Sequence, residues 1–189
     1  MESTGDAQRW LTAWIFSTMP PFLLIDDRSH IDLTSCLGTS WRVVSDTVMG
    51  GVSQGRLSVE TVLGRPCWCL QGEVSLANNG GFVQASLDLG AGEVLDASAY
   101  RGFELDVCGN GETYNLHVRT ADTRIVWQSY RASFVATAQW QTLRLPFSDF
   151  AAYRIDAPLD LRCLRRIGIV AIGRAFTARV CVARVGLYG

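Results

Sequence analysis

From residue 22 onward, apolar and polar residues alternate with a period of two along most of the chain. Residues 81–89, for example, place apolar side chains at positions 83, 85, 87 and 89 and mostly polar ones between them. Successive side chains of a β-strand point to opposite faces, so this alternation predicts a strand with one buried and one solvated face. Further strands are expected at residues 40–46, 55–63, 66–76, 100–108, 113–120, 127–135, 140–147, 164–172 and 176–188.

Short turn signals separate these segments. They are Gly50-Gly51, Gly64-Arg65-Pro66, Asn78-Asn79-Gly80-Gly81, Gly109-Asn110-Gly111 and Ala157-Pro158. About ten strands joined by tight turns predict an all-β fold, an antiparallel β-sandwich or jelly roll. Helix is expected only as short turns within residues 146–153 and 158–166, with Ser148 and Asp160 as caps.

The domain division follows from the same pattern. Residues 20–189 are expected to form one jelly-roll domain, preceded by a poorly ordered N-terminal arm over residues 1–19. We do not interpret the arm as a secretory signal, because acidic residues stand in its leader and no A-x-A site follows. No apolar stretch approaches the ~20 residues of a membrane span, so we expect a cytoplasmic protein.

The amino-acid composition limits the kinds of partner and of chemistry that we expect for this protein. The chain has 189 residues, of which 48% are hydrophobic and 19% charged, which is typical of a globular protein. The net charge of −1 and the absence of a basic run argue against a nucleic-acid partner. All 17 basic residues are arginine, which excludes lysine chemistry.

Six cysteines are present, and we expect them to be reduced because a domain of this size does not need disulfides. Cys67 and Cys69 form a C-x-C pair that would face one side of a strand, where both can serve as small core residues. A zinc site would need two further ligands at short spacing, which the sequence does not offer. We therefore expect no metal and no cofactor.

The sequence offers few of the residue combinations that form known catalytic sites. The chain has two histidines and lacks the nucleophile elbow, the H-E-x-x-H helix and the glycine-rich phosphate loops. Glu104 and Asp106 share one strand face at a spacing that acid/base chemistry could use, but solvated strands often carry such pairs. We therefore do not expect an enzyme.

A polar sheet face is a candidate for ligand binding. If residues 113–120 and 127–135 are antiparallel neighbours, the polar side chains of both strands lie within cross-strand reach. That face combines an aromatic ring, two guanidinium groups and an imidazole. An ordinary solvated sheet explains the same pattern. The residues concerned are Asn115, His117, Arg119, Trp127 and Arg131, with Ser129 between them.

Four segments that follow one another along the chain resemble a known family. They are WRVVSDTVMGGVSQG, GEVSLANNGGF, YRGFELDVCGNGETYNLHVR and WQTLRLPFSDF. In order and spacing they are similar to the complex I intermediate-associated protein 30 family, from about Leu24 to Tyr188. The resemblance implies a galactose-binding-like jelly roll and a role in assembling respiratory complex I, the NADH:ubiquinone oxidoreductase. Mitochondrial members act as chaperones of membrane-arm intermediates and are not catalysts.

This chain departs from those members because it has no convincing mitochondrial presequence and is little more than the bare domain. We therefore expect a stand-alone assembly or chaperone-like factor whose protein client is a respiratory complex subunit or intermediate. The protein would be peripheral to the membrane through that client.

The resemblance directs attention to the two glycine pairs, which adjacent hairpins could bring together. Exposed backbone N–H groups, amides and two apolar anchors would then form a client-binding surface. Alternatively, the glycines only satisfy turn geometry and the anchors, Met49 and Phe82, fill the core. The candidate residues are Asp46, Met49, Gly50, Gly51, Ser53, Asn78, Asn79, Gly80, Gly81 and Phe82.

A carbohydrate-binding module is the second hypothesis, because galactose-binding-like jelly rolls often hold sugars. Stacking plates would come from Trp41, Trp68, Trp127 and Trp140, and the polar face around His117 would complete the site. No calcium loop of the D-x-D-x-D type accompanies them.

Overall fold

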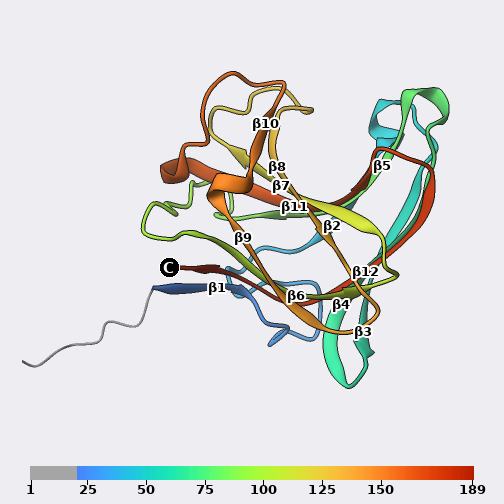
Figure 1. Ribbon diagram of the computed structural model, residues 1–189, viewed down its shortest axis with the longest axis horizontal. Helices are drawn as coiled ribbons and strands as arrows, with labels where there is room; N and C mark the ends of the chain where they lie inside the picture. Colours follow the sequence, from blue (N-terminus) through green and yellow to red (C-terminus); the bar gives the residue numbers. More distant parts are fainter. Residues whose placement is uncertain (1–20) are drawn as a thin grey trace, which may run out of the picture.

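Two antiparallel six-stranded sheets pack face to face in the computed structural model, which describes residues 21–189 (Figure 1). The arm predicted for residues 1–19 lies outside the described residues. The all-β sandwich predicted from the alternation is confirmed. Within the described residues, no helix is long and apolar enough to cross a membrane.

The first sheet has the order β3-β4-β12-β6-β9, with β1 pairing to β12 beside the end of β4. Its strands are β1 (Phe22–Asp26), β3 (Gln54–Val62), β4 (Arg65–Val74), β6 (Gly102–Gly109), β9 (Gln141–Pro146) and β12 (Phe176–Tyr188). The second sheet has the order β10-β8-β7-β11-β5-β2. Its strands are β2 (Arg42–Ser45), β5 (Phe82–Asp88), β7 (Thr113–Thr120), β8 (Ser129–Val135), β10 (Ala151–Tyr153) and β11 (Leu164–Ile172).

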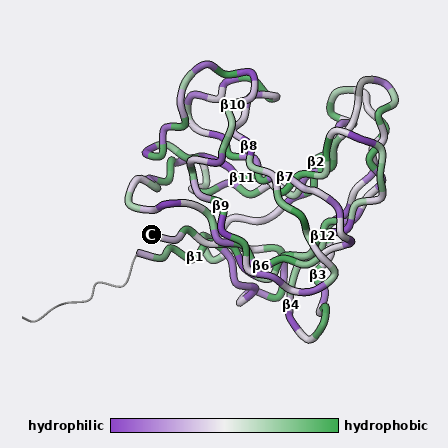
Figure 2. Tube along the Cα trace, viewed as in Figure 1, coloured by the Kyte–Doolittle hydropathy of each residue, from purple (hydrophilic) through white to green (hydrophobic). Residues whose placement is uncertain are grey.

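The core lies between the sheets and consists of the apolar faces that the alternation predicts. Phe103, Leu105 and Val107 of β6 and Tyr114 and Leu116 of β7 are fully buried there. Figure 2 shows apolar stretches running through strands of both sheets. Burying two sheet faces against each other supplies the hydrophobic stabilisation of the fold.

Two tryptophans belong to this core and cannot act as sugar plates. Trp41 and Trp68 are buried, and their ring centroids lie 4.5 Å apart. The indole of Trp41 also donates to Asp26. Stacking on a ligand requires an exposed ring, so the expectation for these two residues is wrong.

In the described part of the chain, the helical content is limited to four short 3₁₀ turns: η1 (Asp46–Met49), η2 (Ala77–Asn79), η3 (Phe147–Asp149) and η4 (Leu161–Cys163). Asp160 caps η4 as predicted, accepting from the backbone N–H of Arg162 at 3.0 Å. The cap predicted at Ser148 is wrong, because that residue lies inside η3, and its hydroxyl donates to Asp149.

The expectation that all cysteines are reduced is also wrong. Cys69 of β4 and Cys181 of β12 form a disulfide. They stand directly opposite each other in the register of the two strands, which brings their Cβ atoms close. Cys36, Cys67, Cys108 and Cys163 are free thiols.

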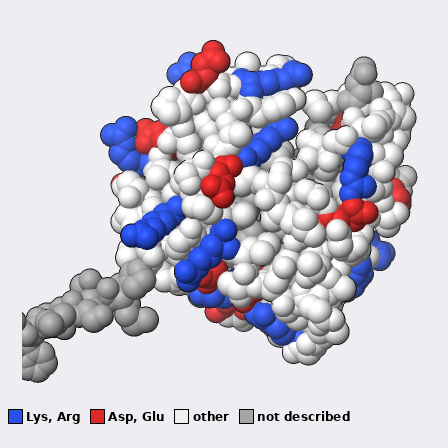
Figure 3. Space-filling view, viewed as in Figure 1, with Lys and Arg blue, Asp and Glu red and all other residues white. Residues whose placement is uncertain are grey.

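Loops rise at both ends of the second sheet in Figure 1, with β7 and β11 between them. The segments around β10 form one lobe. The loops that carry η1 and η2 form the other. A notch between the two lobes is visible in Figure 3.

Candidate functional site

The two glycine pairs converge on the carboxylate of Asp46, which is fully buried. One oxygen accepts from the backbone N–H of Ser53 at 2.9 Å, and the other accepts from the N–H groups of Gly81 at 2.6 Å and Phe82 at 3.2 Å. The Ser53 hydroxyl also donates to this carboxylate. A single side chain therefore ties the loop between β2 and β3 to the loop between β4 and β5.

This close approach explains the glycines. A Cβ atom at Gly51 or Gly80 would collide with the Asp46 side chain. Gly50 and Gly81 have φ of 87° and 138°, which disfavour other residues. The spacing of D-x-V-M-G-G-V-S and N-N-G-G-F is thus the spacing needed to enclose one carboxylate with backbone N–H groups.

The enclosed carboxylate stays ionised. Burial acts to raise the pKa of Asp46, but the hydrogen bonds from Ser53, Gly81 and Phe82 outweigh it and hold the pKa below its ordinary value. A carboxylate that accepts several charge-assisted bonds of this kind is a strong link between the two loops.

These bonds correct one part of the sequence interpretation. The N–H groups of Ser53, Gly81 and Phe82 were expected to be exposed for a client, but they are used by Asp46. The N–H of Gly51 likewise donates to the Asp46 carbonyl. The glycine pairs therefore lie beneath the surface that a client would contact. Their backbone N–H groups are already used within the protein and do not bind a client.

Several of the side chains that these loops expose are apolar. Met49 is 51% exposed, and three residues that the sequence analysis did not single out are similarly open: Val48 at 72%, Val52 at 47% and Leu76 at 53%. Phe82 is only partly exposed. The missed signal was a set of apolar residues inside turn segments, where exposure is expected.

The same end of the molecule is uncharged at its surface. Residues 47–55 and 75–82 contain no acidic, basic or histidine residue. In Figure 3 the uppermost part of the lobe at the upper right shows no blue or red side chain, whereas charged side chains lie lower on that lobe. Asn78 is exposed and has a φ of 56°, and the side chain of Asn79 lies outside the described residues. We call residues 46–55 and 75–82 the glycine-pair end.

The alternative ligand face is assembled on the second sheet. Strands β7 and β8 are antiparallel neighbours, as the sequence hypothesis required, and His117 stands opposite Arg131. The row continues through Gly168 of β11 and Ser86 of β5 to Arg42 of β2. Asn115 lies one step along β7, opposite Ser133, whose hydroxyl donates to it.

His117 is buried within this face, with 8% of its surface exposed, and its Nε2 atom has no hydrogen-bond partner among the described residues. Burial and then the nearby charge of Arg131 lower the pKa of His117 to about 3. The imidazole is therefore neutral at physiological pH. The guanidinium of Arg131 lies 3.4 Å from the ring centroid of Tyr153.

Arg119 and Trp127 occupy one end of the face. The Arg119 guanidinium donates to the carbonyls of Thr123 and Ile125, which anchors the loop that carries Trp127. Trp127 is 46% exposed. A cavity of about 170 Å³ opens beside Arg119 and is also lined by Asp88 and Arg166.

The pair Glu104 and Asp106 has a structural role. Glu104 forms ion pairs with Arg144 and Arg184, both at 2.8 Å, and Asp106 pairs with Arg65 at 2.6 Å. Burial acts to raise the pKa of Asp106, but hydrogen bonds from Thr142 and Arg65 lower it overall. These ion pairs link neighbouring strands of the first sheet.

Comparison with models of known protein families identifies one that matches this chain. The family model described as complex I intermediate-associated protein 30 matches residues 32–179, more than half of the chain. No curated protein sequence matches the chain.

Solved structures show the same fold. A family 11 carbohydrate-binding module from Clostridium thermocellum, in complex with a β-1,3-1,4-mixed-linked tetrasaccharide, has a TM-score of 0.69 at 15% identity, covering 92% of this chain and 98% of that one. The family 11 module of the cellulosomal cellulase Lic26A-Cel5E from the same organism has a TM-score of 0.71 at 13% identity, covering 89% and 95%. The family 30 module of its cellulase Cel9D-Cel44B has a TM-score of 0.63 at 18% identity, covering 88% and 96%. At these identities the likeness concerns the fold.

Proposed function

The chain belongs to the complex I intermediate-associated protein 30 family, and we propose that it is a non-enzymatic assembly factor that binds a protein client, a subunit or intermediate of respiratory complex I. Its family supports the link to complex I. Its structure supports a binding role through the glycine-pair end, and the protein would work at the membrane periphery through its client.

The observation that carries the proposal is the exposed apolar rim of this end. Val48, Met49, Val52 and Leu76 stand in solvent on loops that the Asp46 carboxylate holds together. Exposed apolar side chains on a fixed support bind a partner at low cost in conformational entropy. Met is also suited to surfaces that accept varied apolar partners.

The chemistry of this end specifies the client. Because the glycine-pair end carries no ionisable side chain at its surface, it does not attract a charged segment. It fits an apolar segment of the client that is exposed before assembly. Membrane-arm subunits, the clients implied for mitochondrial relatives, carry such segments.

Affinity capture from native membranes and cytosol tests the proposal. A tagged Met49→Asp, Val52→Asp variant is expected to lose the complex I subunits that the wild type recovers. Ile31→Asp is the matched control, because Ile31 is 95% exposed and lies outside the glycine-pair end. Tryptophan at Gly51 would be a poor test, since it would collide with Asp46 and disrupt the fold.

The proposal fails if the double variant recovers the same subunits as the wild type, or if the wild type recovers none. Circular dichroism and a thermal melt on each variant establish that the comparison is made between folded proteins.

Carbohydrate binding is the second candidate. The observation in its favour is the polar face around His117, whose Nε2 atom has no hydrogen-bond partner within residues 21–189, with the half-exposed ring of Trp127 at its end. One similar fold was solved with a mixed-linked tetrasaccharide. Calorimetric titration with β-glucan oligosaccharides tests it: heat of binding that disappears in Trp127→Ala supports a sugar site, and no heat with the wild type removes it.

A further inference from the structure

Four cysteines gather on the outer face of the first sheet, the face turned away from the core. Cys181 of β12 stands between two of them in one cross-strand row, with Cys69 of β4 on one side and Cys108 of β6 on the other. Cys67 lies two residues before Cys69 and shares its face. Three neighbouring strands therefore contribute to one sulfur cluster.

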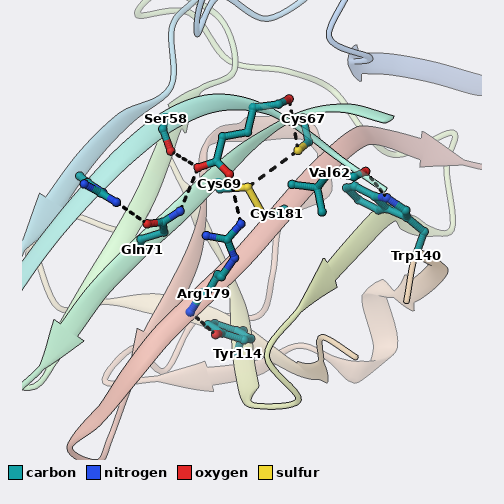
Figure 4. The surroundings of a disulfide bond; sticks show 11 residues. Ser58, Val62, Cys67, Cys69, Gln71, Tyr114, Trp140, Arg179 and Cys181 are labelled. Carbon is teal, nitrogen blue, oxygen red and sulfur yellow. Dashed lines mark hydrogen bonds and ion pairs between the residues drawn. A yellow bond between two sulfur atoms is a disulfide. The ribbon is translucent and has the colours of Figure 1, made fainter. Parts of the chain in front are cut away.

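The cluster is shielded from water. All four cysteines are at most 3% exposed. Val62 and Trp140 pack over them, and the Trp140 indole donates to the Val62 carbonyl at 2.9 Å. Figure 4 shows these two residues beside the sulfur atoms. Side chains on the outward face of a sheet are usually exposed to solvent. Here Val62 and Trp140 keep water away from the thiol groups.

One pair of sulfurs in the cluster has the spacing of a metal-thiolate centre. The Sγ atoms of Cys67, Cys69 and Cys181 all lie within 4.8 Å of one another, and those of Cys67 and Cys69 are 3.8 Å apart. In a tetrahedral zinc site with Zn–S bonds of about 2.3 Å, neighbouring sulfurs are about 3.8 Å apart. The strand geometry already holds one pair of sulfurs at this separation.

Two guanidinium groups, those of Arg65 and Arg179, lie near the cluster and act on Cys108. They would partly offset the negative charge of a thiolate cluster.

We propose that the reduced cluster is a binding site for a thiophilic d¹⁰ cation of the Zn²⁺ type, with Cys67, Cys69 and Cys181 as ligands and Cys108 as the fourth. The Cys69–Cys181 disulfide is the oxidised, metal-free form. A dithiol or phosphine reductant supplies two electrons and two protons are taken up, which breaks the S–S bond and yields two thiols. Zn²⁺ then binds the four sulfurs and four protons are released to solvent.

The sequence could not show this site. C-x-C provides two ligands, and the other two come from positions 39 and 112 residues after Cys69, that is Cys108 and Cys181. Only the pairing of β12 with both β4 and β6 brings them together.

Metal titration of the full-length protein tests the proposal. After phosphine reduction under anaerobic conditions, the protein is titrated with Zn²⁺ against a chromophoric chelator and with Co²⁺ as a spectroscopic probe. One equivalent per chain and the sulfur-to-cobalt charge-transfer and visible bands of a tetrahedral thiolate site are expected. The oxidised protein is expected to bind none.

Single cysteine variants locate the site. Cys67→Ser is expected to weaken Zn²⁺ binding by more than the about 10–100-fold that loss of a supporting residue costs. Cys36→Ser and Cys163→Ser are the controls, because both thiols are free and lie outside the cluster. The proposal is overturned if the reduced wild type binds no Zn²⁺, or if Cys67→Ser binds it as tightly as the wild type.

A protection experiment covers the case in which Cys67→Ser does not fold. The reduced wild type is alkylated with and without Zn²⁺, and the modified residues are identified by mass spectrometry. Zn²⁺ is expected to protect Cys67, Cys69, Cys108 and Cys181 and to leave Cys36 reactive. Equal alkylation of the four with and without Zn²⁺, measured in partly denaturing buffer that admits the reagent, contradicts the proposal.

Discussion

A single carboxylate, that of Asp46, explains most of the motif by which the chain resembles its family. Asn at this position keeps the size of the side chain but replaces one oxygen by an NH₂ group, which faces backbone N–H donors. We expect Asp46→Asn to destabilise the protein by about 3 kcal/mol, since buried donors are left unpaired. Urea unfolding at pH 7 measures it. Asp149→Asn, on an exposed side chain, is the control.

The pH dependence of that loss follows from the lowered pKa of Asp46. A depressed pKa confers stability that is fully present above the unfolded value of about 4 and is lost as the pH falls through the folded value. The stability difference between wild type and Asp46→Asn should therefore shrink below pH 4. A difference that stays constant down to pH 3 would show that Asp46 is not held ionised by these bonds.

Arg28 provides a second local link, in the loop after β1. Its side chain is 2% exposed, and its guanidinium donates to both oxygens of Asp26 and to the carbonyls of His30 and Asp32. Its φ is 64°, in the left-handed region. Glycine suits that backbone, so Arg28→Gly removes the guanidinium without adding strain.

We expect Arg28→Gly to cost about 3–5 kcal/mol, because it leaves the Asp26 carboxylate buried without its cationic partner. Adding Asp26→Asn to Arg28→Gly should then cost less than it does in the wild type. A double-mutant cycle on thermal and urea unfolding measures this coupling. Additive losses would mean that the two residues do not stabilise each other.

At the scale of strands, the alternation predicted almost every element, because each strand has one face in the core. β1 was not among the predicted strands, and β10 lies within residues 146–153, where only a short helical turn was expected. All three residues of β10 are exposed and show no alternation. The disulfide and the sulfur cluster could not be predicted from the alternation, because the register between strands is set by packing across the whole sheet. For the same reason the two glycine pairs could be expected to meet, whereas their enclosure of Asp46 could not be derived.

Strand pairing also determines the pKa of His117, because β8 and β11 lie on either side of β7, the strand that carries it. Its folded pKa of about 3 lies below the unfolded value of about 6.5, so the unfolded chain takes up a proton first as the pH falls. The stability lost between pH 6.5 and pH 5 is about 1.5 kcal/mol by linkage. Above pH 6.5 this contribution is fully present.

His117→Gln is expected to remove this slope, whereas His30→Gln, at the only other histidine and in an exposed position, is expected to keep it. Urea midpoints at pH 5, 6 and 7 measure the effect. A ligand that occupies the face and donates a hydrogen bond to Nε2 would give the same residue a second use.

The two sheets stabilise each other as one unit, since they share a single core and a polar link crosses it. The Tyr114 hydroxyl, from β7, accepts from the N–H of Arg179 on β12 at 2.8 Å and donates to Asn110 at 2.6 Å. Tyr114→Phe leaves the partly buried N–H of Arg179 without its partner and should cost about 1–3 kcal/mol. Tyr100→Phe is the control, because its hydroxyl takes no part in the link.

The stacked pair Trp41 and Trp68 reports on whether the sheets separate, because one ring precedes β2 of the second sheet and the other lies in β4 of the first. If the molecule unfolds as one unit, tryptophan fluorescence and far-ultraviolet circular dichroism shift together in Tyr114→Phe. Two separated transitions would instead mean that the sheets part before either unfolds. In that case the loops between β2 and β3 and between β4 and β5, which connect the two sheets, would shift as the sheets part. A client bound at the glycine-pair end would then not be held rigidly relative to the His117 face.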